Sequence, residues 1–362
     1  MKIPFVDLKA QYLSIKREID ESIQGCVDAT SFVGGHSVSK FEDSFAKYIG
    51  VDHCIGCANG SDALEIALKV AGVGSGDEVI VPALSWISTA GAVNNVGAEP
   101  IFVDVVEDER TIDPLLIESK ITDKTKAIIP VHLYGLPARM DEIMRIASSN
   151  GLIVIEDCAQ AHGAAINGQK TGTFGQLATF SFYPGKNLGA YGDAGCIVTN
   201  DTSYASSCRR HTNHGQLDRH DHQMIGRNSR MDAIQAAILS VKLGYLEEWT
   251  AKRIQLAGIY QASLKNVITP SIPENYRHVF HIYAVASDKR DLLKKTFKEA
   301  QYGFGLHYPV PLPFLPAYKY KGHVKGEFPI SEKLSNTLIS IPIYAELEAD
   351  QLDCVVELMN NL

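Results

Sequence analysis

The first two-thirds of the chain alternates short apolar runs with longer amphipathic stretches. Apolar, β-branched runs predict buried strands at 77–83, 99–105, 125–135 and 151–160. Apolar residues at helical spacing predict helices at 39–50, 60–72 and 140–151. Because strands and helices take turns, the pattern predicts an α/β fold, with a mostly parallel central sheet and helices on both of its faces.

Two of the predicted helices carry terminal signals. Ser39 and Glu42 have the spacing of a capping box, which predicts a helix start at Ser39. The helix at 140–151 ends in Gly151, a residue suited to the position just beyond a helix.

The pattern changes near residue 231. Residues 231–264 form a long, almost unbroken helical stretch, and a strand at 281–287 and a helix at 290–300 follow it. A second, smaller α+β domain is therefore expected. We predict a large α/β domain with an N-terminal arm at 1–245 and a small C-terminal domain at 246–362.

Composition narrows the classes of protein that fit. With 362 residues, 45% hydrophobic and 21% charged, the chain is typical of a two-domain globular enzyme. A net charge of -8 argues against nucleic acid as the main partner. No apolar run reaches membrane-spanning length, and the start MKIPFVDLKAQYL has no apolar signal region. Seven cysteines favour reduced thiols, so we expect a cytoplasmic protein without a membrane partner.

Asp157 is the first candidate for chemistry. It comes after four apolar residues and Glu156, at the carboxyl end of a predicted strand, which is where ligands of open parallel sheets bind. Gln160 comes three residues later and is expected at the same edge. The structural alternative for Asp157 is a helix N-cap.

Lys186 is the second candidate. The segment 177–187 is predicted as another strand that ends in a turn at Pro184 and Gly185, and Lys186 follows this turn. Further glycines stand at 189, 192 and 195. A buried lysine can act as a nucleophile, because desolvation disfavours its charged form. The alternative is a structural ion pair between Lys186 and Asp157.

Two further segments would complete a ligand site. Gly60 and Ser61 directly precede a predicted helix, and the free N–H groups of a helix start bind anions. Trp86 follows a predicted strand and offers a flat apolar surface at the same edge. The alternatives are a plain turn with an N-cap, and a core tryptophan.

One ligand satisfies all these candidates together. Pyridoxal phosphate has a phosphate for the anion cradle, a flat ring for the apolar surface, a ring nitrogen for the carboxylate and an aldehyde for the amine. Known sites for this cofactor combine a Schiff-base lysine with an acidic partner of the pyridinium nitrogen. The combination therefore predicts a pyridoxal-phosphate enzyme.

The order of motifs also resembles a known family. The blocks GSDAL, PALSW, EDCAQAHGA, SFYPGKNLGAYGDAGCIVTND, NHG, GRNSRMDAIQAAIL and HYPVPL closely resemble the DegT/StrS nucleotide-sugar aminotransferases. The resemblance runs from about Phe5 to the C-terminus. It implies a type I aminotransferase-like fold and a homodimer whose active sites lie at the subunit interface.

The resemblance also implies roles for individual residues. Lys186 would carry the cofactor and move protons, Asp157 would hold the ring nitrogen, and Gln160 would lie at the ring hydroxyl. The cofactor phosphate would contact Gly60, Ser61, Ser181 and, from the neighbouring subunit, Asn228. Trp86 would stack on the ring, where relatives often have Tyr or Phe. The sugar nucleotide would contact Tyr183, His220, Arg230, His307 and Tyr308.

The expected reaction is transfer of an amino group, from L-glutamate by resemblance, to a nucleotide-linked keto sugar. The sequence NLGAYGDAG after Lys186 and the block HYPVPL resemble members that aminate carbon 3. The product would enter amino-sugar biosynthesis for surface polysaccharide such as O-antigen, or for a glycosylated product. The alternatives are a 4-keto sugar aminotransferase and a non-catalytic regulator. A sugar dehydratase of the same fold would lack the lysine that is present here.

Two other patterns invite a metal-site interpretation. Cys54 and Cys57 have CxxC spacing, but there is no second pair, and in a strand they would point to opposite faces. Four histidines, at 211, 214, 220 and 222, are closely spaced and are interpreted as a polar active-site loop. No metal site is predicted.

Overall fold

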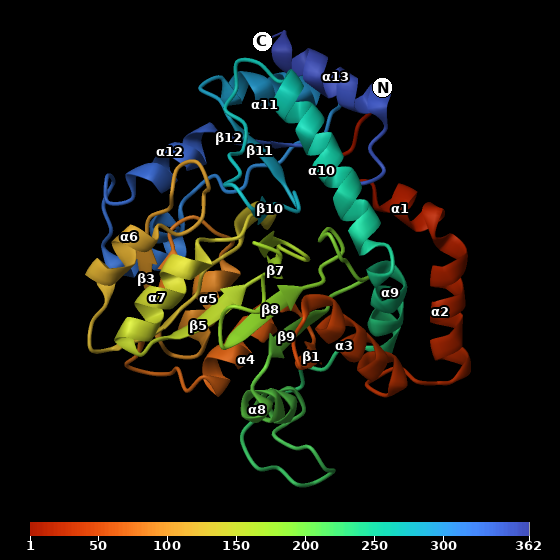
Figure 1. The fold of residues 1–362 in the computed structure, drawn as a ribbon, viewed down its shortest axis with the longest axis vertical. Coiled ribbons are helices and arrows are strands. Elements are labelled where there is room, and N and C mark those ends of the chain that lie inside the picture. Colours follow the sequence, from red (N-terminus) through yellow and green to blue (C-terminus); the bar gives the residue numbers. More distant parts are fainter. Residues whose placement is uncertain (362) are drawn as a thin grey trace.

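The computed structural model describes residues 1–361 and centres on a seven-stranded sheet (Figure 1). Its strands, in spatial order, are β1 (His53–Cys57), β9 (Gly195–Thr199), β8 (Leu177–Ser181), β5 (Ile153–Asp157), β4 (Thr125–Ile128), β2 (Glu78–Pro82) and β3 (Glu99–Val103). From β8 to β3 all neighbours are parallel, whereas β9 is antiparallel to both of its neighbours. The predicted mostly parallel α/β sheet is confirmed.

Helices cover both faces of this sheet because the strands are apolar on both sides. One face packs against α4 (Gly60–Val70), α5 (Ser88–Asn95) and α8 (Thr202–Thr212), and the other against α3 (His36–Ile49), α7 (Met140–Asn150) and α9 (Ala233–Leu243). In β2, Val79 and Val81 pack on the first of these faces and Ile80 packs on the other. This alternation follows from the two-residue period of a strand.

The predicted start of α3 is wrong. The helix begins at His36, after Gly35 at the N-cap position with a φ of 76°. Ser39 therefore lies inside the first turn, where its hydroxyl donates to the carbonyl of Gly35 at 3.1 Å. Glu42 does not close a capping box; its buried carboxylate accepts the N–H of Gly56 at 2.6 Å. A long-range packing contact thus replaces the expected local one.

The long helix predicted at 231–264 is divided in two. α9 ends at Leu243 and α10 (Leu246–Ser263) follows after Gly244 and Tyr245. The N–H groups of these two residues bond to carbonyls three positions back, which tightens the turn. The break sends α10 away from the sheet, toward the upper part of the molecule in Figure 1.

That upper part contains a second core. It consists of α10, the antiparallel pair β11 (Tyr283–Ala286) and β12 (Leu338–Ile341), α11 (Arg290–Glu299) and α13 (Ala349–Asn360). Ile3, near the N-terminus, is buried in the same core and forms a bridge with Tyr302. The division into 1–245 and 246–362 stays a prediction.

The remaining elements lie around these two cores. α2 (Lys16–Asp28) packs against α9, and α1 (Leu8–Ser14) contacts α2. α12 (Pro329–Thr337) packs against β11. Short elements complete the chain: α6 (Pro114–Ile117) and a small sheet of β10 (Tyr276–Arg277), β6 (Ala165–Ile166) and β7 (Gln169–Lys170).

All seven cysteines are free thiols, and Cys54 and Cys57 point into different cores, as predicted for two positions of one strand. Within residues 1–361, no helix combines the length and the apolar character needed to cross a bilayer.

Candidate active site

A cavity of about 650 Å³ opens at the carboxyl ends of β2, β5 and β8, beside the start of α4. Ten of the predicted site residues line it: Gly60, Ser61, Trp86, Asp157, Gln160, Ser181, Tyr183, Lys186, His307 and Tyr308. Because parallel strands end at one edge of the sheet, residues that are distant in sequence meet here. The volume lies within the range of about 300–1,000 Å³ that small-molecule sites occupy.

Lys186 projects into this cavity from a tight turn. Its backbone N–H donates to the carbonyl of Tyr183 at 2.8 Å, and a Cβ on Gly189 would lie 2.3 Å from the carbonyl oxygen of Pro184. Among the described residues, no hydrogen bond or ion pair involves the Lys186 ammonium, so the alternative of a structural ion pair with Asp157 is not realised. Burial lowers the pKa of Lys186 to about 8, although the charge of Asp157 raises it. The amine is thus prepared to act as a nucleophile.

Asp157 lies at the end of β5 and is buried. One carboxylate oxygen accepts the Thr89 hydroxyl at 2.8 Å and the other accepts the N–H of Ala159 at 3.1 Å. Turns rather than a helix follow, so the N-cap alternative is wrong. Burial raises the pKa of Asp157 above its ordinary value, while these two donors and Lys186 act in the opposite direction.

Thr89 was not predicted as a site residue. It lies in α5, and its hydroxyl also bonds to that of Ser85 at 2.9 Å. In the sequence, it stands three residues after Trp86 without any motif that marks it. Its contact with Asp157 joins segments 68 positions apart, so only the fold reveals it.

The start of α4 forms an anion cradle. Asn59 caps the helix by accepting the N–H of Asp62 at 2.8 Å, as the plain-turn alternative proposed. The N–H groups of Gly60 and Ser61 nevertheless have no acceptor in the described part of the chain. A Cβ on Gly60 would lie 2.7 Å from Cβ of Ser181, so glycine keeps the cradle open. Free N–H groups at the positive end of a helix suit a phosphate.

Trp86 and Tyr308 line the same cavity. Trp86 is 57% exposed and its ring centre lies 5.8 Å from that of Tyr308, so it is not a core residue. The amide of Gln160 is fixed from both ends, because it accepts the N–H of Tyr134 at 2.7 Å and donates to the Tyr308 hydroxyl at 2.9 Å. The wall therefore presents a flat ring and an oriented amide.

The C-terminal part of the chain closes the cavity. His307 bonds to the hydroxyl of Ser340 at 2.8 Å and stacks on Phe5, with 5.8 Å between the ring centres. Burial, together with the charge of Lys186, lowers the pKa of His307 to about 4, so the ring is neutral at pH 7. Phe5, Arg253 and His281 also line the cavity, and none of them was predicted.

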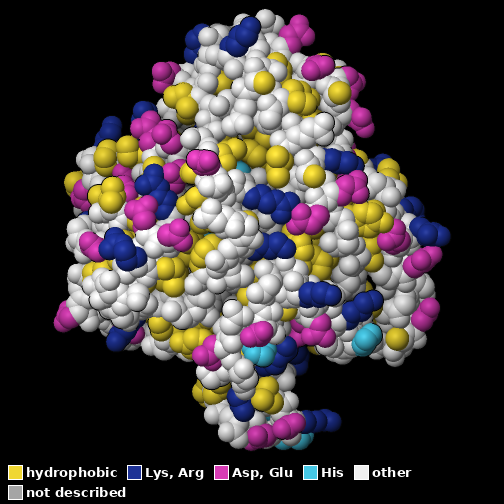
Figure 2. Space-filling view, in the orientation of Figure 1, with side chains coloured by type: hydrophobic (Ala, Val, Ile, Leu, Met, Phe, Trp, Pro, Cys, Tyr) yellow, Lys and Arg dark blue, Asp and Glu magenta, His cyan; other side chains and the backbone are white. Residues whose placement is uncertain are grey.

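Three predicted residues lie outside the cavity of their own chain. Asn228 is exposed and its backbone bridges to Asn213, and Arg230 donates to the side chain of the same Asn213 at 3.1 Å. His220 lies on an exposed loop that follows α8 and extends beyond it (Figure 1). In Figure 2 this loop forms the projection at the lower edge, with hydrophobic, basic, acidic and His side chains on its surface.

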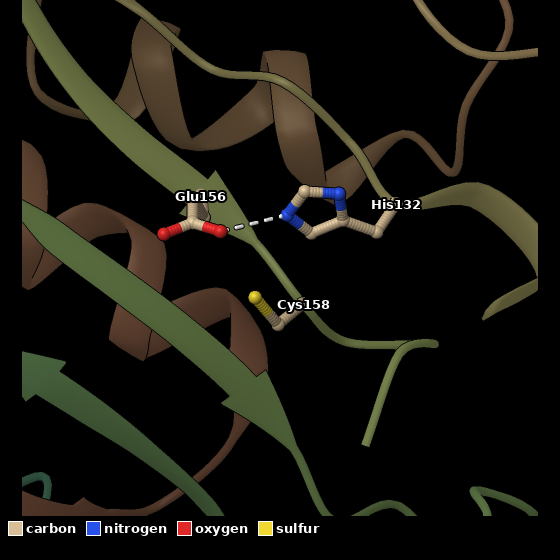
Figure 3. A group of neighbouring side chains, drawn as sticks. All are labelled: His132, Glu156 and Cys158. Atoms are coloured by element: carbon tan, nitrogen blue, oxygen red, sulfur yellow. Dashed lines mark hydrogen bonds and ion pairs between the residues drawn. The ribbon is translucent and has the colours of Figure 1, made fainter. Parts of the chain in front are cut away.

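His132, Glu156 and Cys158 form a buried group whose ligand-type atoms lie within 4.8 Å of one another (Figure 3). His132 Nδ1 accepts the N–H of Ala138 at 3.0 Å, so Nε2 carries the proton that it donates to Glu156 at 3.0 Å. Three backbone N–H groups of the turn at 172–175 also donate to Glu156. Burial raises the pKa of the Cys158 thiol well above its ordinary value. These atoms are already paired or protonated, which indicates a structural network.

Comparisons with known proteins find relatives over almost the whole chain. The model of the DegT/DnrJ/EryC1/StrS aminotransferase family matches residues 13–360. The chain is 44% identical over 362 residues to a "pleiotropic regulatory protein" of Geobacillus stearothermophilus, covering 99% of this chain and 97% of that protein. It is 40% identical over 359 residues to the dTDP-3-amino-3,4,6-trideoxy-alpha-D-glucose transaminase of Streptomyces venezuelae, covering 98% and 95%.

A solved structure is similarly close. The crystal structure of S. venezuelae DesV in complex with a ketimine intermediate superposes with a TM-score of 0.97 at 39% identity, covering 99% of this chain and 98% of that one. The fold and the arrangement of the sheet are therefore those of a solved aminotransferase.

Proposed function

This chain belongs to the DegT/DnrJ/EryC1/StrS family of aminotransferases, and we propose that its amino acceptor is a nucleotide-linked sugar with a keto group at carbon 3. The observation that carries the proposal is the cavity shared by Lys186, Asp157 and the free N–H groups of α4. A related transaminase of S. venezuelae is named for a dTDP-3-amino sugar, which supports carbon 3.

Enzymes of this family depend on pyridoxal phosphate, and the cavity fits that cofactor. The N–H groups of Gly60 and Ser61, with the Ser181 hydroxyl, would hold the phosphate. Asp157 would hold the ring nitrogen in its protonated form, because the buried carboxylate faces the cavity beside the cradle.

The remaining walls would orient the ring and supply the amine. Trp86 would cover a ring face, Gln160 would lie at the ring hydroxyl, and Lys186 would bond to the aldehyde carbon. When bound, the cofactor supplies an electron sink for the carbon that loses its proton. Lys186, whose pKa is lowered to about 8 by burial, would remove that proton and return it in both half-reactions.

The sugar would contact the side of the cavity that Tyr183, His307 and Tyr308 form. A neutral His307, with Nδ1 bonded to Ser340, keeps a ring nitrogen for a sugar hydroxyl. The reacting ketone must lie within about 3–3.5 Å of the amine that attacks it. A shift of one carbon would therefore require a turned sugar ring, so these residues would decide the position of amination.

A homodimer with shared sites is part of the proposal. Asn228, Arg230 and His220 lie outside the cavity of their own chain, so they would act in the site of a partner subunit. The loop beside them exposes apolar side chains, among them Ile225 at 92% exposure. Exposed apolar groups of this kind mark association surfaces.

Donor, compartment and pathway follow from the family resemblance. We propose L-glutamate as the donor, and an amino sugar for surface polysaccharide or a glycosylated product as the outcome. Seven free cysteines fit a reducing compartment, which is consistent with the cytoplasm.

A regulatory role is the second candidate, because the G. stearothermophilus relative is named a pleiotropic regulatory protein. A regulator without catalysis has no need for Lys186 in a glycine-rich turn. The purified protein should be yellow and should lose that colour on addition of L-glutamate. A colourless protein, or one that keeps its colour with every amino acid tested, would favour regulation.

Matched 3-keto and 4-keto nucleotide sugars test the acceptor. The enzyme, L-glutamate and each sugar, linked to uridine or thymidine diphosphate, are incubated, and NMR locates the new amine after mass spectrometry identifies the product. We expect amination at carbon 3. Efficient amination at carbon 4 alone would show that the assignment of position is wrong.

A further inference from the structure

Arg253 interrupts the buried face of α10. The other residues of this face are mainly apolar, and they include Leu246, Trp249, Ala257 and Tyr260. Arg253 lies one and two helical turns from these residues and is 5% exposed. Its side chain also lines the cavity that contains Lys186. A charge at a core position needs a reason, because burying it without a partner is costly.

Backbone carbonyls satisfy only part of the guanidinium. Nη1 donates to the carbonyl oxygens of Phe280 at 3.1 Å and Ile343 at 2.7 Å. In residues 1–361, neither Nη2 nor Nε donates to a protein acceptor, and no carboxylate forms an ion pair with Arg253. The charge of Glu346 acts on Arg253 from beyond ion-pair distance. A guanidinium with free donors therefore faces the cavity.

Four other arginines of the chain, unlike Arg253, form ion pairs with carboxylates. Ion pairs at 2.6 to 3.0 Å join Arg139 to Glu109, Arg209 to Glu42, Arg227 to Asp62 and Arg277 to Glu247. Arg110 also lacks a carboxylate partner, but it does not line this cavity. Arg253 thus combines an unpaired charge with access to the site.

His281 lies within electrostatic range of both Arg253 and Lys186. Asn187 donates its amide to the carbonyl of Val279 at 3.0 Å, so its side-chain oxygen accepts from Nδ1 of His281 at 3.2 Å. Burial, Lys186 and Arg253 together hold the pKa of His281 well below its ordinary value. The imidazole is therefore neutral, and both cations lie close to it.

From this arrangement we infer that Arg253 binds the α-carboxylate of the amino-acid donor, with the free N–H groups of its guanidinium directed into the cavity that Lys186 also lines. In an amino acid, the amine and the α-carboxylate are attached to one carbon, so an amine that reacts at Lys186 places the carboxylate nearby. A planar guanidinium can donate two parallel hydrogen bonds to a carboxylate. The sugar ketone carries no charge at its reacting carbon. Arg253 would therefore recognise the donor and not the acceptor.

The inference rests on the proposed aminotransferase function, and its test separates the two. Arg253→Gln keeps an amide that can donate to the carbonyls of Phe280 and Ile343, and Arg253→Lys keeps the charge. Lys252→Gln removes a charge from the adjacent, exposed position and serves as the control. Calorimetry measures the binding of 2-oxoglutarate to the pyridoxal form, which cannot transfer an amine to it. Absorbance of the cofactor follows the half-reaction with L-glutamate, L-glutamine and L-isoglutamine, the α-amide of glutamate.

We expect Arg253→Gln to bind 2-oxoglutarate about 10- to 100-fold more weakly, as the loss of a charge-assisted pair implies. The half-reactions with glutamate and glutamine should slow alike, because both donors carry the α-carboxylate. The wild type should prefer glutamate to isoglutamine by a similar factor, and the preference should vanish in Arg253→Gln. The KM for the keto sugar should not change, and Lys252→Gln should resemble the wild type.

Several results would overturn the inference. One is an Arg253→Gln variant whose reaction with the donor and whose KM for the keto sugar are impaired to the same extent. Another is a variant whose half-reaction slows with glutamate but not with glutamine. A third is a wild type that reacts with isoglutamine as fast as with glutamate. If Arg253→Gln does not fold, Arg253→Lys and the comparison of donors with the wild type still decide. A wild type that shows this donor pattern but aminates no keto sugar would refute the proposed acceptor and leave Arg253 in its role.

Discussion

At the residue scale, burial governs the charge of the groups around Lys186. It lowers the pKa of Lys186 to about 8 and that of His307 to about 4, and it raises the pKa of Asp157. Each shift follows from one rule, since desolvation disfavours the charged form of any group. The protonation states of the amine and the carboxylate that face this cavity therefore depend on what occupies it.

Lys186→Ala should abolish transamination while the protein stays folded. The side chain makes no hydrogen bond or ion pair with the described residues, so its loss removes chemistry and few stabilising contacts. Turnover should fall by at least the factor of about 10²–10⁴ that a positioned acid–base group contributes. Steady-state kinetics and a thermal melt check this, and turnover close to that of the wild type would refute the assignment.

Capture of the cofactor by the apoenzyme should depend on pH through Lys186. The free amine is the nucleophile, and its fraction increases as the pH rises through the pKa of about 8. The rate of Schiff-base formation should therefore increase up to that pH and level off above it. Asp157→Asn should move the midpoint lower, because the charge of Asp157 raises the pKa of Lys186. Borohydride trapping with mass spectrometry measures the rate, and a midpoint near that of an exposed lysine would contradict the prediction.

At the element scale, the start of α4 and the ends of the strands create the site. A helix start leaves N–H groups unpaired, and the carboxyl ends of parallel strands leave loops at one edge. Here Gly60 packs against Ser181 at the end of β8, so helix and strand approach too closely for any side chain at Gly60. The anion site therefore depends on the contact between α4 and β8, and neither element would form it alone.

Gly60→Ala should weaken cofactor binding by about tenfold or more. The added Cβ would lie 2.7 Å from Cβ of Ser181, so the helix start must shift. Its N–H groups would then no longer point at the phosphate, and the hydrogen bonds to it would weaken. Gly91→Ala in α5 is the matched control, because a Cβ there meets nothing within 4 Å. Titration of each apoprotein with pyridoxal phosphate provides the affinities. Equal affinities for the two variants would show that the cradle does not hold the phosphate.

At the scale of the whole molecule, the site joins parts that the sequence keeps far apart. β5 provides Asp157, the turn after β8 provides Lys186, α10 provides Arg253, and the C-terminal part provides His307. Asn228, in contrast, lies outside the cavity of its own chain. The proposed dimer would bring it to the site of the partner.

Mixed dimers test the shared site. Lys186→Ala subunits are mixed with Asn228→Ala subunits, each of which is weak or inactive as a homodimer. If Asn228 acts across the interface, one site of each heterodimer carries neither defect and the other carries both, so activity should recover in part. Activity is measured after subunit exchange has been verified by native mass spectrometry. No recovery would mean that both residues serve the site of one chain.

Local signals predict this structure correctly at the central strands. The strands ending at Asp157 and Ser181 begin with apolar residues and are almost entirely buried, so their type and the edge they share could be predicted. The prediction is wrong at the start of α3, where the carboxylate of Glu42 bonds to the N–H of Gly56 and not to the helix start. Local signals do not report a competing partner that lies elsewhere in the chain.

The sequence by itself determined the alternation of strands and helices, the placement of Asp157 at a strand end and of Lys186 in the turn that follows a strand, and the glycines near Lys186. Periodicity and residue type specify these features, because they depend on neighbours along the chain. Only the tertiary structure decided that Thr89 bonds to Asp157, that α10 turns away at Gly244, and that Arg253 faces the cavity without a counterion. These features depend on packing between distant segments, whose distances no local pattern contains.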